Sequence, residues 1–272
     1  MDEAAFIAAL RTLPLHPGAQ GLSDDAALLT LGGETLILTH DMIVAGVHYL
    51  PDEDPYNIAW RLIATNLSDL AAKGAEPVGV MLGAVLLPDM ARFVEGLRAI
   101  LNRYGVPLLG GDTVSSGGGQ ASFGCTAIGR ATALPVPVRS GARAGDRLML
   151  VGTIGAARLG HRAILNGIDA PAMVEAYRRP LPLLDEGRAL APHAHAMMDV
   201  SDGLLLDAGR MAEASGVTLA IELAALMPAI ADDPRVAPFD WRAAASWGDD
   251  YALLAAVDPA VDPATLPGRA IG

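Results

Sequence analysis

The sequence predicts a two-domain α+β / α/β protein, with a mixed α+β domain at residues 1–137 and an α/β domain at residues 138–272. In the first half, apolar runs typical of strands mix with amphipathic helical stretches, without strict strand-helix-strand alternation. A linker with Pro135 and Pro137 follows at 133–138. A glycine-punctuated turn then leads into the strand expected at 147–151. The length of 272 residues suits one large domain or two modest ones.

The elements of the first half follow from local periodicity and from chain breakers. Glycines 32 and 33 separate two short apolar runs, which predicts a β-hairpin. The apolar run at 78–87 is typical of a buried strand, and Asp89 is placed to begin a helix with one apolar face. In order, we expect a helix at 3–10, strands at 26–29 and 35–39, a helix from about 54 to 74, a strand at 78–87, a helix to 104, a strand at 107–109, a flexible loop at 115–119 and a strand at 121–128.

The second half is expected to alternate strands with helices. Its predicted strands lie at 147–151, 195–200, 217–222 and 251–257, and a helix is predicted at 204–214. Gly203 and the aspartates around it form a polar turn between the second of these strands and that helix.

The helix at 54–74 is the stretch around which the chain is organised. Its apolar residues recur at helical spacing, Pro55 suits its first turn and Gly74 suits its end. Yet Asn66, Ser68 and Asp69 lie within one turn of this mostly apolar helix. A carboxylate on a buried helix needs a cation or several hydrogen-bond donors. Asp69 therefore either caps the helix or pairs with a neighbouring residue, or it belongs to a functional site.

Further aspartates favour a site. They occur in short polar or glycine-rich motifs beside strand-like runs: Asp24-Asp25, Thr39-His40-Asp41, Gly110-Gly111-Asp112 and Asp199-Val200-Ser201-Asp202. Aspartates at strand ends can converge on one point, and hard oxygen ligands with little histidine and no cysteine suit Mg²⁺ rather than zinc. The pattern predicts a magnesium-polyphosphate site.

Composition excludes several partners. Acidic residues outnumber basic ones by 31 to 19, for a formal net charge of −12, which opposes binding to nucleic acid and to anionic membranes. The acidic start Met1-Asp2-Glu3 lacks the basic region of a signal peptide, and the longest apolar run is too short to cross a bilayer. We therefore expect a cytoplasmic protein. Cys125, the one cysteine, is expected to be a small buried residue.

Seven motifs in order resemble those of the thiamine-monophosphate kinase family, which is related to aminoimidazole ribonucleotide synthetase and selenophosphate synthetase. They are Asp24-Asp25-Ala26-Ala27, Thr39-His40-Asp41 with Gly46-Val47-His48-Tyr49, Asn66-Leu67-Ser68-Asp69-Leu70-Ala71-Ala72-Lys73-Gly74-Ala75, Gly110-Gly111-Asp112-Thr113, Arg139-Ser140-Gly141-Ala142-Arg143, Asp199-Val200-Ser201-Asp202-Gly203-Leu204 and Gly248-Asp249-Asp250-Tyr251. The resemblance implies an N-terminal sheet that pairs with that of a second subunit in a homodimer. It also implies that ATP and thiamine monophosphate react by direct in-line, Mg²⁺-assisted transfer to give thiamine diphosphate.

The resemblance also implies roles for individual residues. The expected Mg²⁺ ligands are Asp25, Thr39, His40, Asp41, Asp69, Asp112, Asp199 and Asp202. Of these, Asp41, Asp69 and Asp112 are the expected catalytic residues. The expected nucleotide contacts are Tyr104, Gly111, Arg139 and Ser201, and the expected thiamine-phosphate contacts are His48 and Asp249.

Three departures from the family pattern leave alternatives open. His40 stands where threonine is common, Asp249 stands where the family usually has glutamate, and no aromatic residue corresponds to the family's final segment. Trp247 is either a core residue or a ring that stacks on the substrate. The alternatives to the kinase are another ATP-using enzyme of the same group with a different small acceptor, and an inactive homologue that binds Mg²⁺ and nucleotide.

Overall fold

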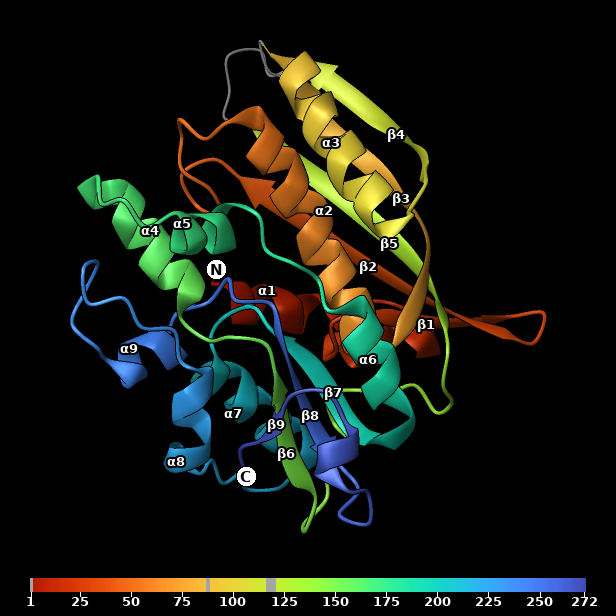
Figure 1. Cartoon of the computed structure of the whole chain (residues 1–272). Coiled ribbons are helices and arrows are strands. Elements are labelled where there is room, and N and C mark those ends of the chain that lie inside the picture. The colour runs from red at the N-terminus through yellow and green to blue at the C-terminus, as the bar shows by residue number, and fades with distance from the viewer. Residues whose placement is uncertain (1, 87–88, 116–120) are drawn as a thin grey trace.

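The computed structural model describes residues 2–86, 89–115 and 121–272 of the chain, and it contains two β-sheets joined through one central helix (Figure 1). The first sheet has the strand order β1-β2-β5-β3-β4 and the second has the order β7-β8-β6-β9. The first sheet lies entirely before residue 132 and the second begins at Arg147. The division at 137/138 remains a proposal.

The first sheet begins with the predicted hairpin. Its strands are β1 (Ala27–Leu31), β2 (Glu34–Val44), β3 (Ala75–Leu86), β4 (Leu108–Ser115) and β5 (Ser122–Ala131). All neighbouring strands are antiparallel except β3 and β4, which run parallel. Two strands are longer than predicted, because β2 continues past Asp41 and β4 includes the glycine motif at 110–112. The loop expected at 115–119 lies mostly outside the described residues, since only Ser115 belongs to them.

Helices cover one face of the first sheet. The predicted central helix is α2 (Pro55–Ala72), and beside it lies α3 (Met90–Tyr104) (Figure 1). Asp54 caps α2 by accepting a 2.9 Å hydrogen bond from the backbone N–H of Tyr56. The ring of Phe93 on α3 stacks on that of Phe123 on β5, with 4.7 Å between the ring centroids.

The other face of this sheet carries exposed apolar side chains. Met42, Met81 and Val114 are 54%, 45% and 53% exposed. The expectation that the strand at 78–87 is buried therefore holds for only one of its faces, because successive strand residues point to opposite sides of the sheet.

The second half surrounds an antiparallel sheet with short helices. The strands are β6 (Arg147–Val151), β7 (Ala194–Val200), β8 (Ala252–Val257) and β9 (Arg269–Ala270). The helices are α4 (Ala156–Asn166), α5 (Pro171–Arg178), α6 (Leu184–Leu190), α7 (Leu204–Ser215), α8 (Leu223–Leu226) and α9 (Trp241–Ala245), while α1 (Glu3–Leu10) belongs to the first half.

The prediction of a strand at 217–222 is wrong. This segment contains no assigned strand, and Glu222 donates one backbone hydrogen bond, of 2.6 Å, to Ile271.

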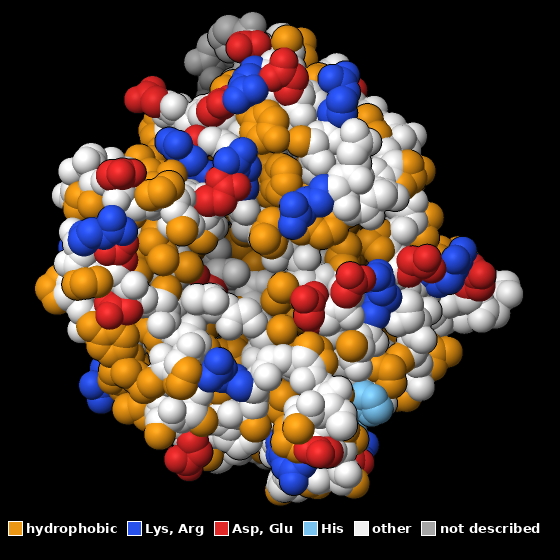
Figure 2. Space-filling model, in the orientation of Figure 1, with side chains coloured by type: hydrophobic (Ala, Val, Ile, Leu, Met, Phe, Trp, Pro, Cys, Tyr) orange, Lys and Arg blue, Asp and Glu red, His pale blue; other side chains and the backbone are white. Residues whose placement is uncertain are grey.

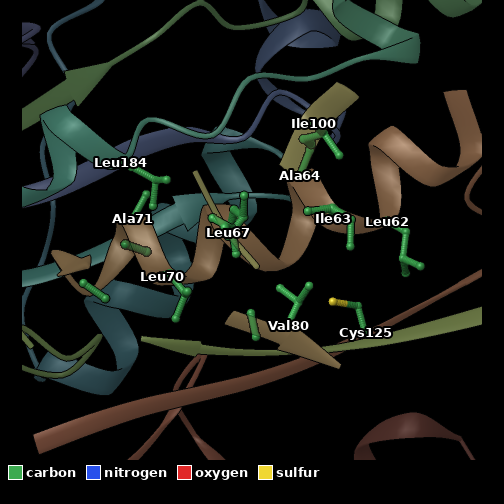
Figure 3. Close-up of a cluster of buried hydrophobic side chains, with 14 of the residues drawn as sticks. Leu62, Ile63, Ala64, Leu67, Leu70, Ala71, Val80, Ile100, Cys125 and Leu184 are labelled. Carbon is green, nitrogen blue, oxygen red and sulfur yellow. The ribbon is translucent and has the colours of Figure 1, made fainter. Parts of the chain in front are cut away.

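The core is centred on α2. All residues from Asn57 to Ala72 are buried. Leu62, Leu67 and Leu70 pack toward the first sheet near Val80 and Cys125, while Ala71 lies close to Leu184 of the second half (Figure 3). The expectation that Cys125 is buried is confirmed.

The molecular surface in the view of Figure 2 shows acidic and basic side chains interspersed among apolar ones. Among the described residues, no helix combines the length and the apolar character that crossing a membrane requires.

Candidate functional site

A cavity of about 380 Å³ lies where α2 meets β2, the end of β7 and the segment before β8. We call it the acidic cavity because six aspartates contribute to its lining: Asp25, Asp41, Asp69, Asp199, Asp202 and Asp249. The lining thus draws on both halves of the chain, and it brings together most of the aspartate motifs that the sequence singled out.

One face of α2 supplies the floor of the acidic cavity. Arg61, Thr65 and Asp69 all line it, and they are spaced four residues apart. Residues at this spacing lie above one another on the same side of an α-helix. Since the rise is 1.5 Å per residue, Arg61 and Asp69 are separated by about 12 Å along the helix axis.

The polar residues on the last turns of α2 connect it to other elements. Asp69 accepts a short hydrogen bond from the hydroxyl of Thr39 on β2. Asn66 accepts a 3.0 Å hydrogen bond from the backbone N–H of Asp41, and Ser68 donates a 2.6 Å hydrogen bond to Asp199 on β7. These contacts explain why an apolar helix carries three polar side chains within one turn.

The carboxylates at this end of the cavity repel one another. Burial, together with the neighbouring charges of Asp199 and Asp41, raises the pKa of Asp69 well above its ordinary value. Burial also raises the pKa of Asp199 to about 8, and it raises the pKa of Asp41. A bound cation would stabilise the ionised forms of these three aspartates, because a buried carboxylate is costly to ionise unless a positive charge compensates it.

A magnesium ion fits this donor set by its chemistry, since Mg²⁺ prefers carboxylate oxygens. Among the described residues, no three His, Cys, Asp or Glu side chains form a ready-made ligand group for one metal ion. Mg²⁺ does not require such a group, because it usually keeps several waters and binds through one or two carboxylates together with substrate phosphates. Asp41, Asp69 and Asp199 are the residues that could hold it.

Asp25 is already paired with two cations. Its Oδ2 lies 3.0 Å from the ammonium of the buried Lys73, and its Oδ1 accepts a short hydrogen bond from Arg139. Burial alone would raise the pKa of Asp25, but the attraction of Lys73 and Arg139 outweighs that effect and lowers the pKa. Asp25 therefore anchors Arg139 at the cavity wall, and its role as a metal ligand remains a prediction.

Five of the predicted site residues do not line the acidic cavity: Thr39, His40, Tyr104, Gly111 and Asp112. Thr39 adjoins it, because its hydroxyl donates to Asp69. His40 points to the opposite face of the sheet, where its Nδ1 lies 2.8 Å from the hydroxyl of Thr126. Asp112 lies on the exposed strand β4, and with His40 it lines a smaller cavity of about 230 Å³ on that face. Gly111 precedes it on β4, and Tyr104 ends α3. Within one chain, His40 and Asp112 thus lie on the side of the first sheet opposite the acidic cavity. Tyr104 lies on the helix-covered side, and Gly111 lies on the edge strand β4.

Both substrate residues that the sequence predicted, His48 and Asp249, line the acidic cavity. Asp249 lies 3.2 Å from the guanidinium of Arg61. His48 also lines the cavity, and its Nδ1 accepts a 3.1 Å hydrogen bond from the backbone N–H of Val44. Asp202, near the cavity rim, is paired with Arg210. Ser201 also lines the cavity.

Sequence reasoning missed Arg61, Lys73 and Arg210 as members of the site. A signal was present for Arg61, because a charged residue on an apolar helix, eight positions before Asp69, falls on the same helical face. Lys73 lies within one of the motifs that carry the family resemblance, but no role was expected for it.

Comparisons with known proteins identify relatives over most of the chain. The family model of the AIR synthase related protein N-terminal domain matches residues 23–131, and that of the C-terminal domain matches residues 143–262. The thiamine-monophosphate kinase of Caulobacter vibrioides is 42% identical over 257 residues, covering 89% of this chain and 72% of that protein. The Salmonella typhimurium enzyme of the same name is 35% identical over 277 residues, covering 93% and 83%.

Solved structures agree with these relatives. A ThiL protein complexed with AMPPCP and TMP superposes with a TM-score of 0.81 at 25% identity, covering 99% of this chain and 89% of that one. A thiamine-monophosphate kinase from Stenotrophomonas maltophilia gives a TM-score of 0.75 at 32% identity, covering 93% and 84%. The hydrogenase maturation protein HypE from E. coli, at 21% identity and a TM-score of 0.68, shares the fold and covers 87% of this chain and 78% of its own. The chain therefore belongs to the thiamine-monophosphate kinase family, within the AIR synthase related proteins.

Proposed function

We propose that this protein transfers the γ-phosphoryl group of ATP to the phosphate of thiamine monophosphate, which yields ADP and thiamine diphosphate. The observation that carries the proposal is the acidic cavity, which gathers carboxylates for metal-bound phosphates at one end and Asp249 at the other. Thiamine monophosphate itself joins a phosphate to a positively charged thiazolium ring, so the cavity offers each part a partner of suitable charge. The named relatives and the ThiL complex with AMPPCP and TMP support the same reaction.

Mg²⁺ is the cofactor in this proposal, held by Asp41, Asp69 and Asp199 with Asp25, Asp202 and the backbone near Thr39 and His40 as further candidates. When bound, it neutralises the phosphates and the carboxylates, which a chain of net charge −12 needs if it is to bind anionic substrates. The transfer itself is in line and direct. The protein therefore has to position the two substrates and does not have to supply a nucleophile.

The remaining residues of the cavity bind and orient the two substrates. Arg139 and Ser201 contact the nucleotide, and the Arg139 guanidinium is suited to phosphate oxygens as a charge-assisted donor. His48 and Asp249 contact the thiamine phosphate. Tyr104, Gly111 and Asp112 are further candidates for the nucleotide site, with Asp112 also a candidate catalytic residue. Because none of these three residues lines the acidic cavity within one chain, their part in the site depends on the assembly of the protein.

The assembly that we propose is a homodimer in which the exposed face of the first sheet meets a second copy. Met42, Met81 and Val114 make this face apolar, and large exposed apolar patches mark interaction surfaces. Replacing Met81 with Asp is expected to convert the dimer to a monomer, measured by light scattering after size-exclusion chromatography. An unmodified chain that is monomeric at micromolar concentration would contradict the proposal. The cytoplasmic location expected from the sequence stays a prediction.

The reaction is tested with purified protein and Mg-ATP in the presence of thiamine monophosphate, thiamine, or no acceptor. ADP and thiamine diphosphate are separated by chromatography. The proposal expects both products to form only with thiamine monophosphate. Mg-ATP binding without any product would favour an inactive homologue, and ADP formation with another small phosphorylated acceptor would favour a different enzyme of the same group.

A pair of variants links the reaction to the cavity. Asp69→Asn is expected to abolish turnover and weaken Mg-ATP binding, because Asp69 lies among the carboxylates of the metal end. The matched control is Asp185→Asn, whose carboxylate is 87% exposed and pairs with Arg188 on the surface of α6. This control should retain full activity.

A further inference from the structure

The guanidinium of Arg61 is buried at the end of the acidic cavity opposite the carboxylate cluster. Its side chain is only 2% exposed. The Cζ atom lies 4.5 Å above the centroid of the Tyr177 ring, and one Nη2 hydrogen is donated to the Tyr177 carbonyl. A planar guanidinium can stack on a ring and donate in its own plane at the same time, which an ammonium cannot do. The second half of the chain thus holds this side chain rigidly.

The anionic partner of Arg61 is Asp249. Nη1 of Arg61 lies 3.2 Å from Oδ1 of Asp249, and among the described residues this Nη1 has no hydrogen-bond partner. The Tyr251 hydroxyl lies 3.3 Å from the same Oδ1. Both contacts use one oxygen, while the Asp249 side chain remains 30% exposed and lines the cavity. The carboxylate is therefore held from one side and open to a ligand from the other.

The backbone of Asp249 is also fixed. Asp249 and Tyr251 have φ angles of 67° and 51°, in the left-handed region that residues other than glycine seldom adopt. The N–H of Asp249 donates a 2.8 Å hydrogen bond to Ser201, and that of Tyr251 donates a 2.9 Å hydrogen bond to Val200. Strained backbone of this kind persists where the surroundings impose it, which is common at binding sites.

We propose that Arg61 is a positioning residue for the acceptor: it orients Asp249 so that the carboxylate faces the positively charged thiazolium ring of thiamine monophosphate. This inference rests on the proposed function. Without Arg61, the Asp249 carboxylate, whose side chain is 30% exposed, would be free to rotate away from the ring site. Arg61, about 12 Å along α2 from Asp69, keeps it at the other end. The helix then sets the separation between the site for the phosphates and the site for the ring.

The test measures KM for thiamine monophosphate, KM for ATP and kcat in variants at positions 61 and 249. Arg61→Met is expected to raise KM for thiamine monophosphate about tenfold, a loss typical of one charged contact, while KM for ATP stays within about twofold. Calorimetric titration with thiamine monophosphate in the absence of ATP should show the same loss of affinity. Unchanged KM and unchanged affinity in Arg61→Met would overturn the inference.

A rescue experiment separates orientation of Asp249 from a structural role. Lysine is shorter than arginine and glutamate is longer than aspartate, so Arg61→Lys with Asp249→Glu restores the reach of the pair. Each single change is expected to raise KM for thiamine monophosphate about fivefold, and the double variant should return to within about twofold of the unmodified chain. Additive effects of the two changes would mean that Arg61 acts without Asp249, and the inference would be wrong.

The matched control is Arg178→Met, which removes a partly buried arginine that pairs with Glu53 at 3.1 Å near the start of α2. It should leave KM for thiamine monophosphate unchanged. Product formation by the unmodified chain is measured separately. If the unmodified chain makes no thiamine diphosphate, the proposed function is wrong. If the unmodified chain is active but Arg61→Met leaves KM and affinity for thiamine monophosphate unchanged, only the role of Arg61 is wrong.

Discussion

The hydroxyl of Ser68 donates a 2.6 Å hydrogen bond to the carboxylate of Asp199, which lies 131 positions further along the chain. This bond ties α2 of the first half to the end of β7 in the second half. Asp199 is 3% exposed, and its raised pKa of about 8 reflects burial and the nearby charge of Asp25. The bond holds in place a carboxylate that is costly to ionise without a cation.

Asp199→Asn should therefore stabilise the protein in the absence of metal. At about pH 8 the substitution removes the cost of a buried charge, and we expect the free energy of unfolding to rise by about 1–2 kcal/mol. Millimolar Mg²⁺ should raise the melting temperature of the unmodified chain but not that of the variant. Differential scanning calorimetry with and without Mg²⁺ measures both effects. A variant that is less stable and still responds to Mg²⁺ would contradict this assignment.

Lys73 is expected to be the main internal counter-charge of the site. Its ammonium is buried and lies 2.6 Å from Asp24, 3.0 Å from Asp25 and 3.2 Å from the carbonyl of Met197. Lys73→Met leaves Asp24 without its cation and Asp25 with Arg139 alone, and we expect it to lower the free energy of unfolding by about 3–5 kcal/mol. Urea denaturation near pH 7 measures the change. Adding Asp24→Asn should recover part of the loss, and an equal loss in the double variant would argue against this pairing.

Much of this site could be predicted from local sequence, because α2 has clear periodicity, a proline at its start and a glycine after its end. The aspartate motifs at Asp41, Asp69 and Asp199 do line one cavity. The pair of Arg61 and Asp249 could not be predicted in this way. Its members are far apart in sequence, and only the packing of the second half against α2 brings them together.

Two differences from expectation have simple geometric reasons. Thr39, His40 and Asp41 were expected to act together, yet they lie on one strand, where neighbouring side chains point to opposite faces. Thr39 and Asp41 face α2, while His40 faces outward with Thr126. The segment 217–222 has a strand-like composition, but it is not part of the second sheet because no strand of that sheet pairs with it among the described residues.

Asp250 should make the stability of the fold depend on pH. Burial raises its pKa to about 7 from an ordinary 3.8, although the backbone N–H groups of Gly155 and Ala157 donate to it. Between about pH 4 and pH 7 the folded chain keeps a proton that the unfolded chain has released, so stability falls as pH rises and levels off above about 7. The slope from this group is at most about 1.4 kcal/mol per pH unit.

The measurement for Asp250 is urea denaturation at half-unit steps from about pH 5 to about pH 8. Because burial also raises the pKa values of Asp69 and Asp199, the informative quantity is the difference in unfolding free energy between the unmodified chain and Asp250→Asn. The variant should show a smaller decrease in stability across this window. Parallel curves for the two proteins would show that Asp250 is not the titrating group.

Gly187 should be needed for the contact between α6 and α2. A Cβ atom at this position would lie 2.0 Å from the backbone oxygen of Ala71, so Gly187→Ala must push the two helices apart. We expect a loss of about 2–3 kcal/mol in unfolding free energy, the range for an overpacked core. Gly209→Ala on α7 is the matched control, because its Cβ would meet no atom within 4 Å, and it should stabilise the protein by about 0.5–1 kcal/mol.

The burial of α2 on almost every side also limits how the two halves could be separated by recombination. Met197, Leu253 and Val257 of the second sheet belong to the same buried cluster as α2. A gene fragment that encodes only residues 138–272 would produce a chain with these side chains uncovered, and a fragment without the second half would expose the opposite side of α2. We therefore expect neither half to fold well alone, because separating them exposes apolar side chains of both.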